Sequence, residues 1–191
     1  MSGDTHAAVA LAVTTSLLPT MSVEEQTFAL ALVAFGAILP DVDQTNKRTK
    51  KMVMTALVVL GLLVTGTSGV IKTLNPTAML GLALLAVWIV IGYTRPHREF
   101  THSFVAASIA TVAVAMITFS TRVSDVAALY TLNFGLAMLS HDLIDTLNGK
   151  RVHLLWPSPG GVCFNLVAAS GTGNNLVKYM SLLIVAINFV V

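Results

Sequence analysis

Long apolar runs, separated by short segments that carry Pro, Gly and charge, occupy most of this sequence. Runs bounded in this way predict helices at residues 7–20, 25–39, 52–71, 77–93, 101–119, 125–145 and 175–191. A helix needs about 20 apolar residues to cross the hydrocarbon core of a bilayer. The four runs from 52–71 to 125–145 therefore predict membrane spans. The first two runs are short, and could be tilted, re-entrant or buried among the others.

The composition agrees with a membrane protein. Hydrophobic residues make up 55% of the chain and charged residues 10%, whereas a soluble domain carries about 25% charged residues. This deficit excludes a water-soluble domain, a disordered tail and a nucleic-acid-binding protein. We therefore expect an all-α integral membrane helical bundle of about five to seven hydrophobic helices, forming a single domain over residues 1–191.

The chain has one cysteine, Cys163, so neither a disulfide framework nor a thiolate zinc site is expected. Any bound metal must be held by His and carboxylate side chains. Asp4 and His6 precede the first apolar run without a Lys or Arg, which is a poor match to a cleavable signal peptide. We expect this segment to be retained.

Positive charge gives the predicted bundle an orientation. If each run crosses the membrane once, the segments on one side are residues 1–6, 40–51, 94–100 and 146–174. Most basic residues fall on that side, namely Lys47, Arg48, Lys50, Lys51, Arg95, Arg98, Lys150 and Arg151. Only Lys72 and Arg122 fall on the other side. The positive-inside rule then makes the first side cytoplasmic.

The same alternation gathers most His residues and several acids at the cytoplasmic helix ends. The set comprises His6, Asp41, Asp43, His97, Glu99, His102, His141, Asp142 and Asp145. Ionisable side chains at the edge of the hydrocarbon core are costly, so they are functional candidates. The four separated segments that carry them should meet at one membrane depth, and His6 joins the set on this ground alone.

Spacing identifies the first candidate metal ligands. His141 and Asp145 are four residues apart on a predicted helix, so both side chains lie on one face and could bind one ion. The alternative is a hydrogen bond between them at the helix end. Asp41 follows Pro40 at a helix C-terminus, where the helix dipole disfavours negative charge. Either a metal ion or a buried Arg98 should compensate it.

The neighbouring candidates allow more than one interpretation. Asp43 could face the same metal or be neutralised by the basic segment that follows it. His102 lies at the start of a predicted helix, where the helix dipole keeps an imidazole neutral and available as a ligand. His102 therefore ranks above His97. The alternative is a helix cap at Thr101 or Ser103, with histidines that are merely interfacial.

Five stretches of the chain carry a resemblance to a known family. They are THAAVALAV from residue 5, GAILPDVD from 36, HREFTHS from 97, LSHDLIDTLNGKRVHLLWP from 139 and GTGNN from 171. In this order they resemble the YdjM-like family of bacterial inner-membrane metal-dependent hydrolases, which has members under LexA control in the SOS response. The resemblance implies a multi-pass inner-membrane protein with a hydrolase-like metal centre at the cytoplasmic side.

The order His, Asp, His and then HxxxD is also similar to the all-helical zinc phospholipases C and related nucleases, in which a zinc cluster cleaves phosphodiesters. Two positions depart from the YdjM-like pattern. Gln44 stands where family members often have His, and Val177 stands where they often have Glu. If these residues complete a second metal site, this chain could hold fewer ions and have reduced activity.

Our hypothesis from the sequence is a metal-dependent hydrolase. One or two divalent ions, zinc first with Mn or Mg as alternatives, would be held by His6, Asp41, His102, His141 and Asp145. Water bound to such an ion has a pKa of about 7 and can attack a phosphorus or carbonyl centre. A site at the membrane edge suits an amphiphile, so the expected partners are the lipid bilayer and a phospholipid or other lipid phosphate.

The remaining polar residues have expected roles in the reaction. Asp43 or Asp142 would orient the water or act as general base, and His97 would protonate the leaving group. Arg98 would bind a phosphate oxygen. One alternative is a non-enzymatic membrane scaffold or stress-response protein with a structural His/Asp metal site. A small ion transporter is disfavoured, because the candidates crowd one face rather than the midplane.

Overall fold

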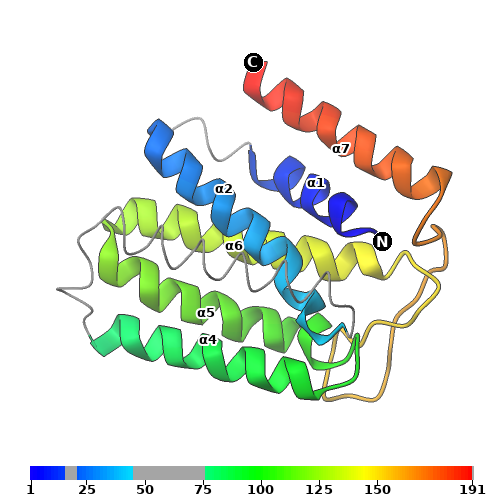
Figure 1. Ribbon diagram of the computed structural model, residues 1–191, viewed down its shortest axis with the longest axis horizontal. Helices are drawn as coiled ribbons and strands as arrows, with labels where there is room; N and C mark the ends of the chain where they lie inside the picture. Colours follow the sequence, from blue (N-terminus) through cyan, green and yellow to red (C-terminus); the bar gives the residue numbers. More distant parts are fainter. Residues whose placement is uncertain (16–20, 45–75, 191) are drawn as a thin grey trace.

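The computed structural model describes residues 1–15, 21–44 and 76–190, whose regular elements are helices (Figure 1). In chain order these are α1 (Gly3–Thr14), α2 (Val23–Ile38), η2 (Leu39–Asp43), α4 (Pro76–Thr94), η4 (Phe100–His102), α5 (Phe104–Thr121), α6 (Ser124–Asp145) and α7 (Thr172–Val190). Within these ranges, β pairing is limited to a single bridge between Val152 and Val162. The all-α prediction is therefore confirmed for this part of the chain.

The observed helices match the predicted ones in place and differ at their ends. The first helix begins at Gly3 rather than residue 7, and the last begins at Thr172 rather than 175. The run predicted at 101–119 is divided into η4 and α5. The predicted segments that lie outside the described residues are 16–20 and 52–71, together with the basic residues of 45–51.

Local sequence signals set the start and the end of α2, and two acids follow its C-terminal end. At its start, Ser22 and Glu25 form a capping box, in which the Ser22 backbone N–H donates to the Glu25 carboxylate at 2.8 Å. At its end, Pro40 has no N–H and cannot extend the α-helical ladder. The chain therefore tightens into the 3₁₀ turn η2, which places Asp41 and Asp43 among buried residues.

The start of α5 is set by Ser103. Its hydroxyl oxygen accepts a hydrogen bond from the Ala106 backbone N–H at 3.1 Å and donates to the Phe100 carbonyl at 2.6 Å. Of the two caps that the sequence suggested, Ser103 is therefore the one used. Thr101 lies one residue before His102 in η4 and is left to make contacts in the polar cluster described below.

The helices pack around α6 (Figure 1). α4, α5 and α6 lie side by side, α2 and α1 pack against α6, and α7 packs against α1. Aromatic residues fill the centre: Phe28 contacts Tyr130 with ring centroids 4.7 Å apart, and Phe35 contacts Phe134 at 5.8 Å. The buried indole N–H of Trp88 donates to a backbone carbonyl of α5 at 2.8 Å. This core holds the helix ends in fixed register.

Three described segments are long and apolar enough to cross a membrane: Val23–Asp43, Pro76–Thr94 and Phe104–Thr121. The predicted span 125–145 is not among them, because α6 carries polar residues such as Asn133, His141 and Asp142 that make it less apolar. The first span reaches full length only because η2 extends α2. The described residues thus contain six α-helices, with fewer apolar spans than the five to seven hydrophobic helices expected.

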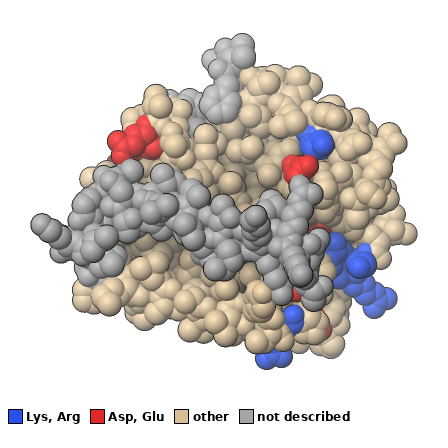
Figure 2. Space-filling view, viewed as in Figure 1, with Lys and Arg blue, Asp and Glu red and all other residues tan. Residues whose placement is uncertain are grey.

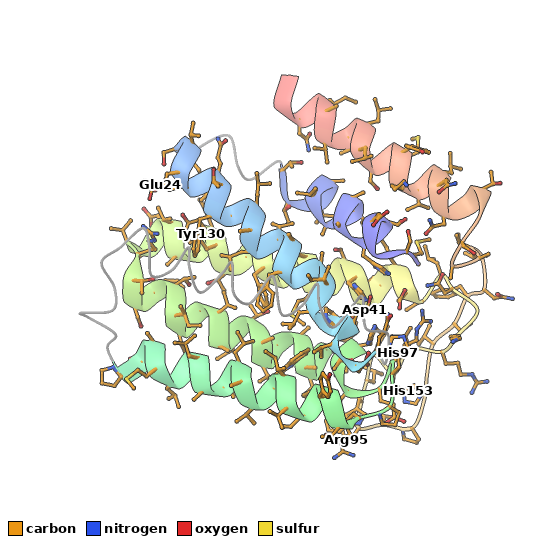
Figure 3. The ribbon with its side chains drawn as sticks, in the orientation of Figure 1. Glu24, Asp41, Arg95, His97, Tyr130 and His153 are labelled. Carbon is orange, nitrogen blue, oxygen red and sulfur yellow. The ribbon has the colours of Figure 1, made fainter. Side chains whose placement is uncertain are left out.

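Every described α-helix has one end at the same side of the bundle. α2, α4 and α6 end there, whereas α1, α5 and α7 begin there (Figure 1). Figure 3 shows Asp41, His97 and Arg95 at this end and Glu24 and Tyr130 at the opposite end. The Lys and Arg side chains visible in Figure 2 also gather toward the first end. The described helices thus bring ends that are distant in the sequence to one side of the bundle.

Gly36 allows α2 to pack closely against α6. A Cβ at this position would lie 2.8 Å from the Phe134 carbonyl oxygen and 3.1 Å from Ala137 Cβ. Gly36→Ala should therefore lower the free energy of unfolding by about 1–3 kcal/mol, although Ala favours helix formation. Gly3→Ala is the control, because a Cβ there meets nothing within 4 Å. Thermal unfolding in detergent, followed by circular dichroism, should separate the two variants; equal midpoints would contradict the packing.

Candidate metal centre

The five predicted metal ligands come from four segments and meet in one buried cluster. α1 supplies His6, η2 supplies Asp41, η4 supplies His102, and α6 supplies His141 and Asp145. Each of these residues is at most 8% exposed. We call these five residues the donor cluster. Polar and charged groups buried this deeply require partners or a bound ion, because their transfer from water is costly.

The donor atoms of this cluster face one another at short range. His6 Nε2 lies 3.1 Å from Asp145 Oδ1, and His102 Nε2 lies 3.3 Å from His141 Nε2. Asp41 Oδ1 lies 3.7 Å from the Nε2 atoms of both His102 and His141. Asp145 Oδ2 is also 3.7 Å from His102 Nε2. The five side chains therefore present their nitrogen and oxygen donors to a common volume.

These spacings fit a divalent cation. Two ligands that lie about 2.1 Å from one ion at a tetrahedral angle are about 3.4 Å apart. There are two potential metal-binding triads, His6–His141–Asp145 and Asp41–His102–His141. Within each triad, the three donor atoms lie within 4.8 Å of one another. The triads share His141, so they are adjacent parts of one site. The buried His and Asp groups can therefore hold a metal ion with nitrogen and oxygen ligands.

The two central histidines are oriented by contacts on their other ring nitrogen. His141 Nδ1 lies 2.6 Å from the Ala37 carbonyl oxygen, which can only accept, so Nδ1 carries the proton and the lone pair of Nε2 points into the cluster. His102 Nδ1 lies 3.0 Å from the Thr101 hydroxyl, which donates to Asp43. Contacts of this kind fix the tautomer and ring position of metal-binding histidines.

Asp43 and His97 form the outer edge of the cluster. His97 Nδ1 lies 2.6 Å from Asp43 Oδ1, and Asp43 Oδ2 accepts the backbone N–H of Arg98 at 3.1 Å. Asp43, His97 and His102 make a third potential metal-binding triad. The Asp43 side chain is fully buried, whereas that of His97 is 31% exposed. The cluster therefore meets the surface at His97.

Arg98 pairs with Asp145 rather than with Asp41, the partner considered from the sequence. Its guanidinium lies 2.8 Å from Asp145 Oδ2 and donates to the Lys150 carbonyl at 3.0 Å. Its φ of 71° is in the left-handed region, which is uncommon for a residue with a side chain. Contacts on both its backbone and its side chain hold Arg98 in this conformation.

Asp142 differs from the other acids of the site. It is 0% exposed, and neither carboxylate oxygen has a hydrogen-bond partner among the described residues. Burial raises the pKa of Asp142 to about 8, and when it is ionised its charge acts on His102, the central imidazole. Burial disfavours protonation of His102, but hydrogen bonds to Asp41 and Asp43 and the charge of Asp142 outweigh burial and raise the pKa of His102 to about 10. The carboxylates thus favour positive charge at the centre of the cluster.

Several contacts in the site involve residues that sequence reasoning missed. The Asn148 side-chain amide donates to Asp145 Oδ1 at 2.8 Å. Asn174, in the GTGNN stretch, accepts hydrogen bonds from the Ser2 backbone at 3.1 Å and the Thr5 hydroxyl at 3.0 Å, and so ties α7 to α1. The GTGNN motif was the only sequence signal for this contact. Glu99 lies outside the potential metal-binding triads.

Comparison with known protein families gives a match to the family described as YdjM inner membrane protein, over residues 1–190. The matched region includes every residue of the donor cluster. No curated protein and no solved structure matches the chain.

Removing one carboxylate from the donor cluster should release the ion. Asp41→Ala is expected to lower the affinity for a divalent metal by more than about 100-fold, because a charged ligand is lost. Asp125→Ala, at the opposite end of α6 and exposed, is the matched control. Elemental analysis of purified protein, with chelator competition, measures the effect. Equal metal content in both variants would show that Asp41 is not a ligand.

The Thr101 hydroxyl should matter through His102. Thr101→Val removes the group that links His102 Nδ1 to Asp43, and we expect metal affinity to fall by about 10–100-fold. Thr101→Ser keeps the hydroxyl and should stay close to the original affinity. Chelator competition at fixed pH compares the two variants. If Thr101→Val and Thr101→Ser have the same metal affinity, the Thr101 hydroxyl does not orient the His102 imidazole.

Proposed function

The chain belongs to the YdjM inner membrane protein family, and on this premise we propose that it is a membrane-bound metal-dependent hydrolase that cleaves a phosphoester of a lipid. The observation that carries the proposal is the donor cluster, in which three imidazoles and two carboxylates from four segments converge at the end of apolar helices. Zinc is the proposed ion, because the donors are imidazole-rich and lack sulfur.

The open edge of the site favours catalysis over a purely structural ion. Structural metal sites are closed by protein ligands, whereas catalytic sites keep a side accessible to water or substrate. The donor cluster is buried on its inner side, but its neighbour His97 is partly exposed. Substrate would approach along this edge, which the positive-inside rule places on the cytoplasmic side of the membrane.

The ion, when bound, would supply an acidified water and stabilise charge on the phosphoryl group. Asp142 is the proposed proton acceptor, because both of its oxygens lack partners among the described residues. Asp43 is already engaged with His97, Thr101 and the Arg98 backbone. Its role is therefore to hold His97 Nδ1, which leaves the other ring nitrogen to protonate the leaving oxygen.

Arg98 has a different role from the one expected for it. Its guanidinium is engaged with Asp145 and with the Lys150 carbonyl, so it is not available to a phosphate oxygen without breaking these contacts. We assign it as a positioning residue that holds Asp145 in the donor cluster.

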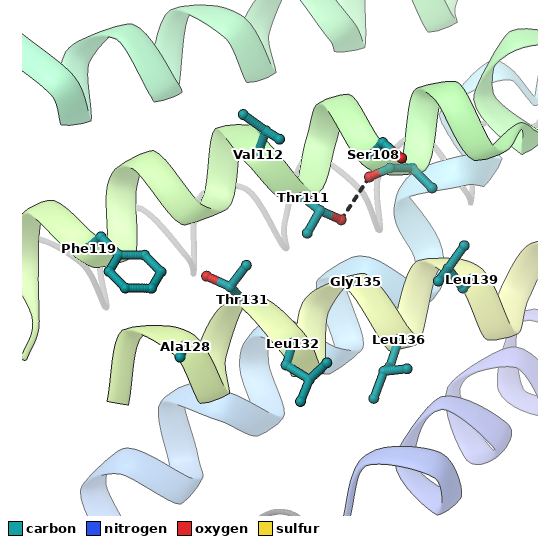
Figure 4. A pocket seen from close by; sticks show the side chains of 11 residues that line it. Ser108, Thr111, Val112, Phe119, Ala128, Thr131, Leu132, Gly135, Leu136 and Leu139 are labelled. Atoms are coloured by element: carbon teal, nitrogen blue, oxygen red, sulfur yellow. Dashed lines mark hydrogen bonds between the residues drawn. The ribbon is translucent and has the colours of Figure 1, made fainter. Parts of the chain in front are cut away.

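An apolar groove supports a lipid as the substrate. The groove lies between α5 and α6, has a volume of about 570 Å³, and is lined by residues such as Thr111, Val112, Leu132 and Leu136 (Figure 4). It extends from Leu139, two residues before His141, toward the far end of both helices. Because α5 is a candidate span, the groove faces the depth at which acyl chains lie.

A non-enzymatic scaffold with a structural ion is the second candidate. It is favoured by Gln44, whose side-chain amide donates to Asp41 Oδ1, a proposed metal ligand. This contact would compete with an ion for one carboxylate oxygen. Transport is less well supported, since the segments that carry the site residues meet at helix ends rather than along the middle of the described bundle. Figure 3 shows Asp41 and His97 at that end.

Turnover of a defined lipid phosphate tests the proposal. Zinc-loaded protein in nanodiscs that contain phosphatidic acid or phosphatidylglycerol should release phosphate or headgroup, and a chelator should stop the release. Asp142→Asn should lower kcat by about 100-fold or more while metal content is unchanged; Asp125→Asn is the matched control. Stoichiometric metal without turnover of either lipid would favour the scaffold and contradict the hydrolase.

A further inference from the structure

A polar pocket of about 420 Å³ opens beside the exposed edge of the metal centre, where α4 ends. Its wall includes Asp43 and His97, the outer pair of the cluster, and two basic side chains, Arg95 and Lys150. Figure 3 shows Arg95 and His97 at this same end of the bundle. The pocket is therefore lined by two basic residues and shares Asp43 and His97 with the outer edge of the proposed metal site.

We propose that this pocket binds the phosphate group of the substrate, and that Arg95 and Lys150 are the side chains that recognise it. The inference rests on the proposed function and deepens it, because it names the binding residues and the chemical class of the ligand, a phosphate mono- or diester. In this proposal Arg95 and Lys150, which line an open cavity, recognise the phosphate in place of Arg98.

Burial and pairing distinguish these cations from Arg98. Arg98 is 8% exposed, and its guanidinium is held by Asp145 and a carbonyl oxygen. Arg95 and Lys150 are exposed, and they come from separate segments on opposite sides of η4 in the chain. Two cations that converge on one cavity from different segments can contact a phosphate from two directions.

The carboxylate of Asp43 does not prevent an anion from entering the pocket. One oxygen faces His97 Nδ1, and the other accepts the Arg98 N–H and the Thr101 hydroxyl. With its lone pairs engaged in this way, Asp43 presents a partly neutralised surface. His97 bridges the two sites, since one ring nitrogen faces Asp43 and the ring also lines the pocket. A phosphate in the pocket would therefore lie next to the proposed proton donor.

The position of the pocket relative to the bilayer fits an amphiphile. α4 is a candidate span whose outer surface includes the exposed side chains of Val87, Val90 and Ile91. Arg95 follows this apolar surface directly, at the depth where basic residues meet lipid phosphates. A lipid could thus keep its acyl chains against the helices while its phosphate enters the pocket. A soluble phosphoester offers the same chemistry without the apolar part.

Binding of two phosphate probes to the metal-loaded Asp142→Asn variant in detergent tests the inference, because this variant is expected to keep its metal without turning over the lipid probe; the further substitutions are made in this background. The probes are inorganic phosphate and dihexanoyl phosphatidic acid, with dissociation constants from calorimetry. The double variant Arg95→Gln/Lys150→Gln should weaken binding of phosphatidic acid by about tenfold or more. The control Arg151→Gln/Lys178→Gln removes the same charge from side chains that do not line the pocket, and its affinity should stay within about twofold.

Each outcome bears on the inference. If the double variant binds both probes more weakly, the pocket recognises the phosphate group itself. If it binds only phosphatidic acid more weakly, the pocket recognises a membrane lipid headgroup. Both results support the assignment. Equal dissociation constants for the two double variants would overturn it. Arg95→Lys/Lys150→Arg keeps both charges and should retain binding, which would show that the loss of charge, rather than substitution at these positions, weakens binding. Circular dichroism of the Gln double variant should match that of the parent protein. Because binding is measured without turnover, an inactive protein that binds phosphate would contradict only the hydrolase.

Discussion

Imidazoles and carboxylates are buried around one shared volume in this protein, and burial of so many ionisable groups is the most costly feature of the fold. Asp41, Asp145 and their three histidine partners are almost fully removed from water, and the neighbouring Asp142 has no hydrogen-bond partner among the described residues. Buried carboxylates are tolerated only when positive charge balances them. Arg98, the N-terminal ammonium of Met1 (2.8 Å from Asp145 Oδ1) and the imidazoles supply part of that balance, and a divalent cation would add to it.

The helical bundle meets this constraint by bringing helix ends, rather than helix faces, to the site. Alternating helices place the C-terminal ends of α2 and α6 beside the N-terminal ends of α1 and α5. Two short 3₁₀ turns then direct the side chains: η2 follows from Pro40, and η4 places Thr101 and His102 before the cap at Ser103. The apolar core keeps these helix ends in register. Packing far from the site therefore fixes the relative positions of its side chains.

The sequence predicted the helices that the structure describes, and it proposed the five residues of the donor cluster, because apolar periodicity and alternation are sufficient to bring segment ends together. It did not predict how the polar groups divide their roles. The pairing of Arg98 with Asp145 depends on a left-handed backbone conformation that no local signal indicates. The use of Thr101 at the site, rather than as a cap, depends on which of the hydroxyls of Thr101 and Ser103 accepts a backbone N–H of α5, and the structure shows that Ser103 does so.

The central claim is that His6, His102, His141, Asp41 and Asp145 surround one cation. X-ray absorption spectroscopy at the zinc edge, on protein loaded with one zinc ion per chain, tests this claim most directly. The account predicts a shell of nitrogen and oxygen without sulfur, with the outer-shell scattering of about three imidazoles. A protein that retains no stoichiometric metal, or a zinc shell without imidazole scattering, would contradict it.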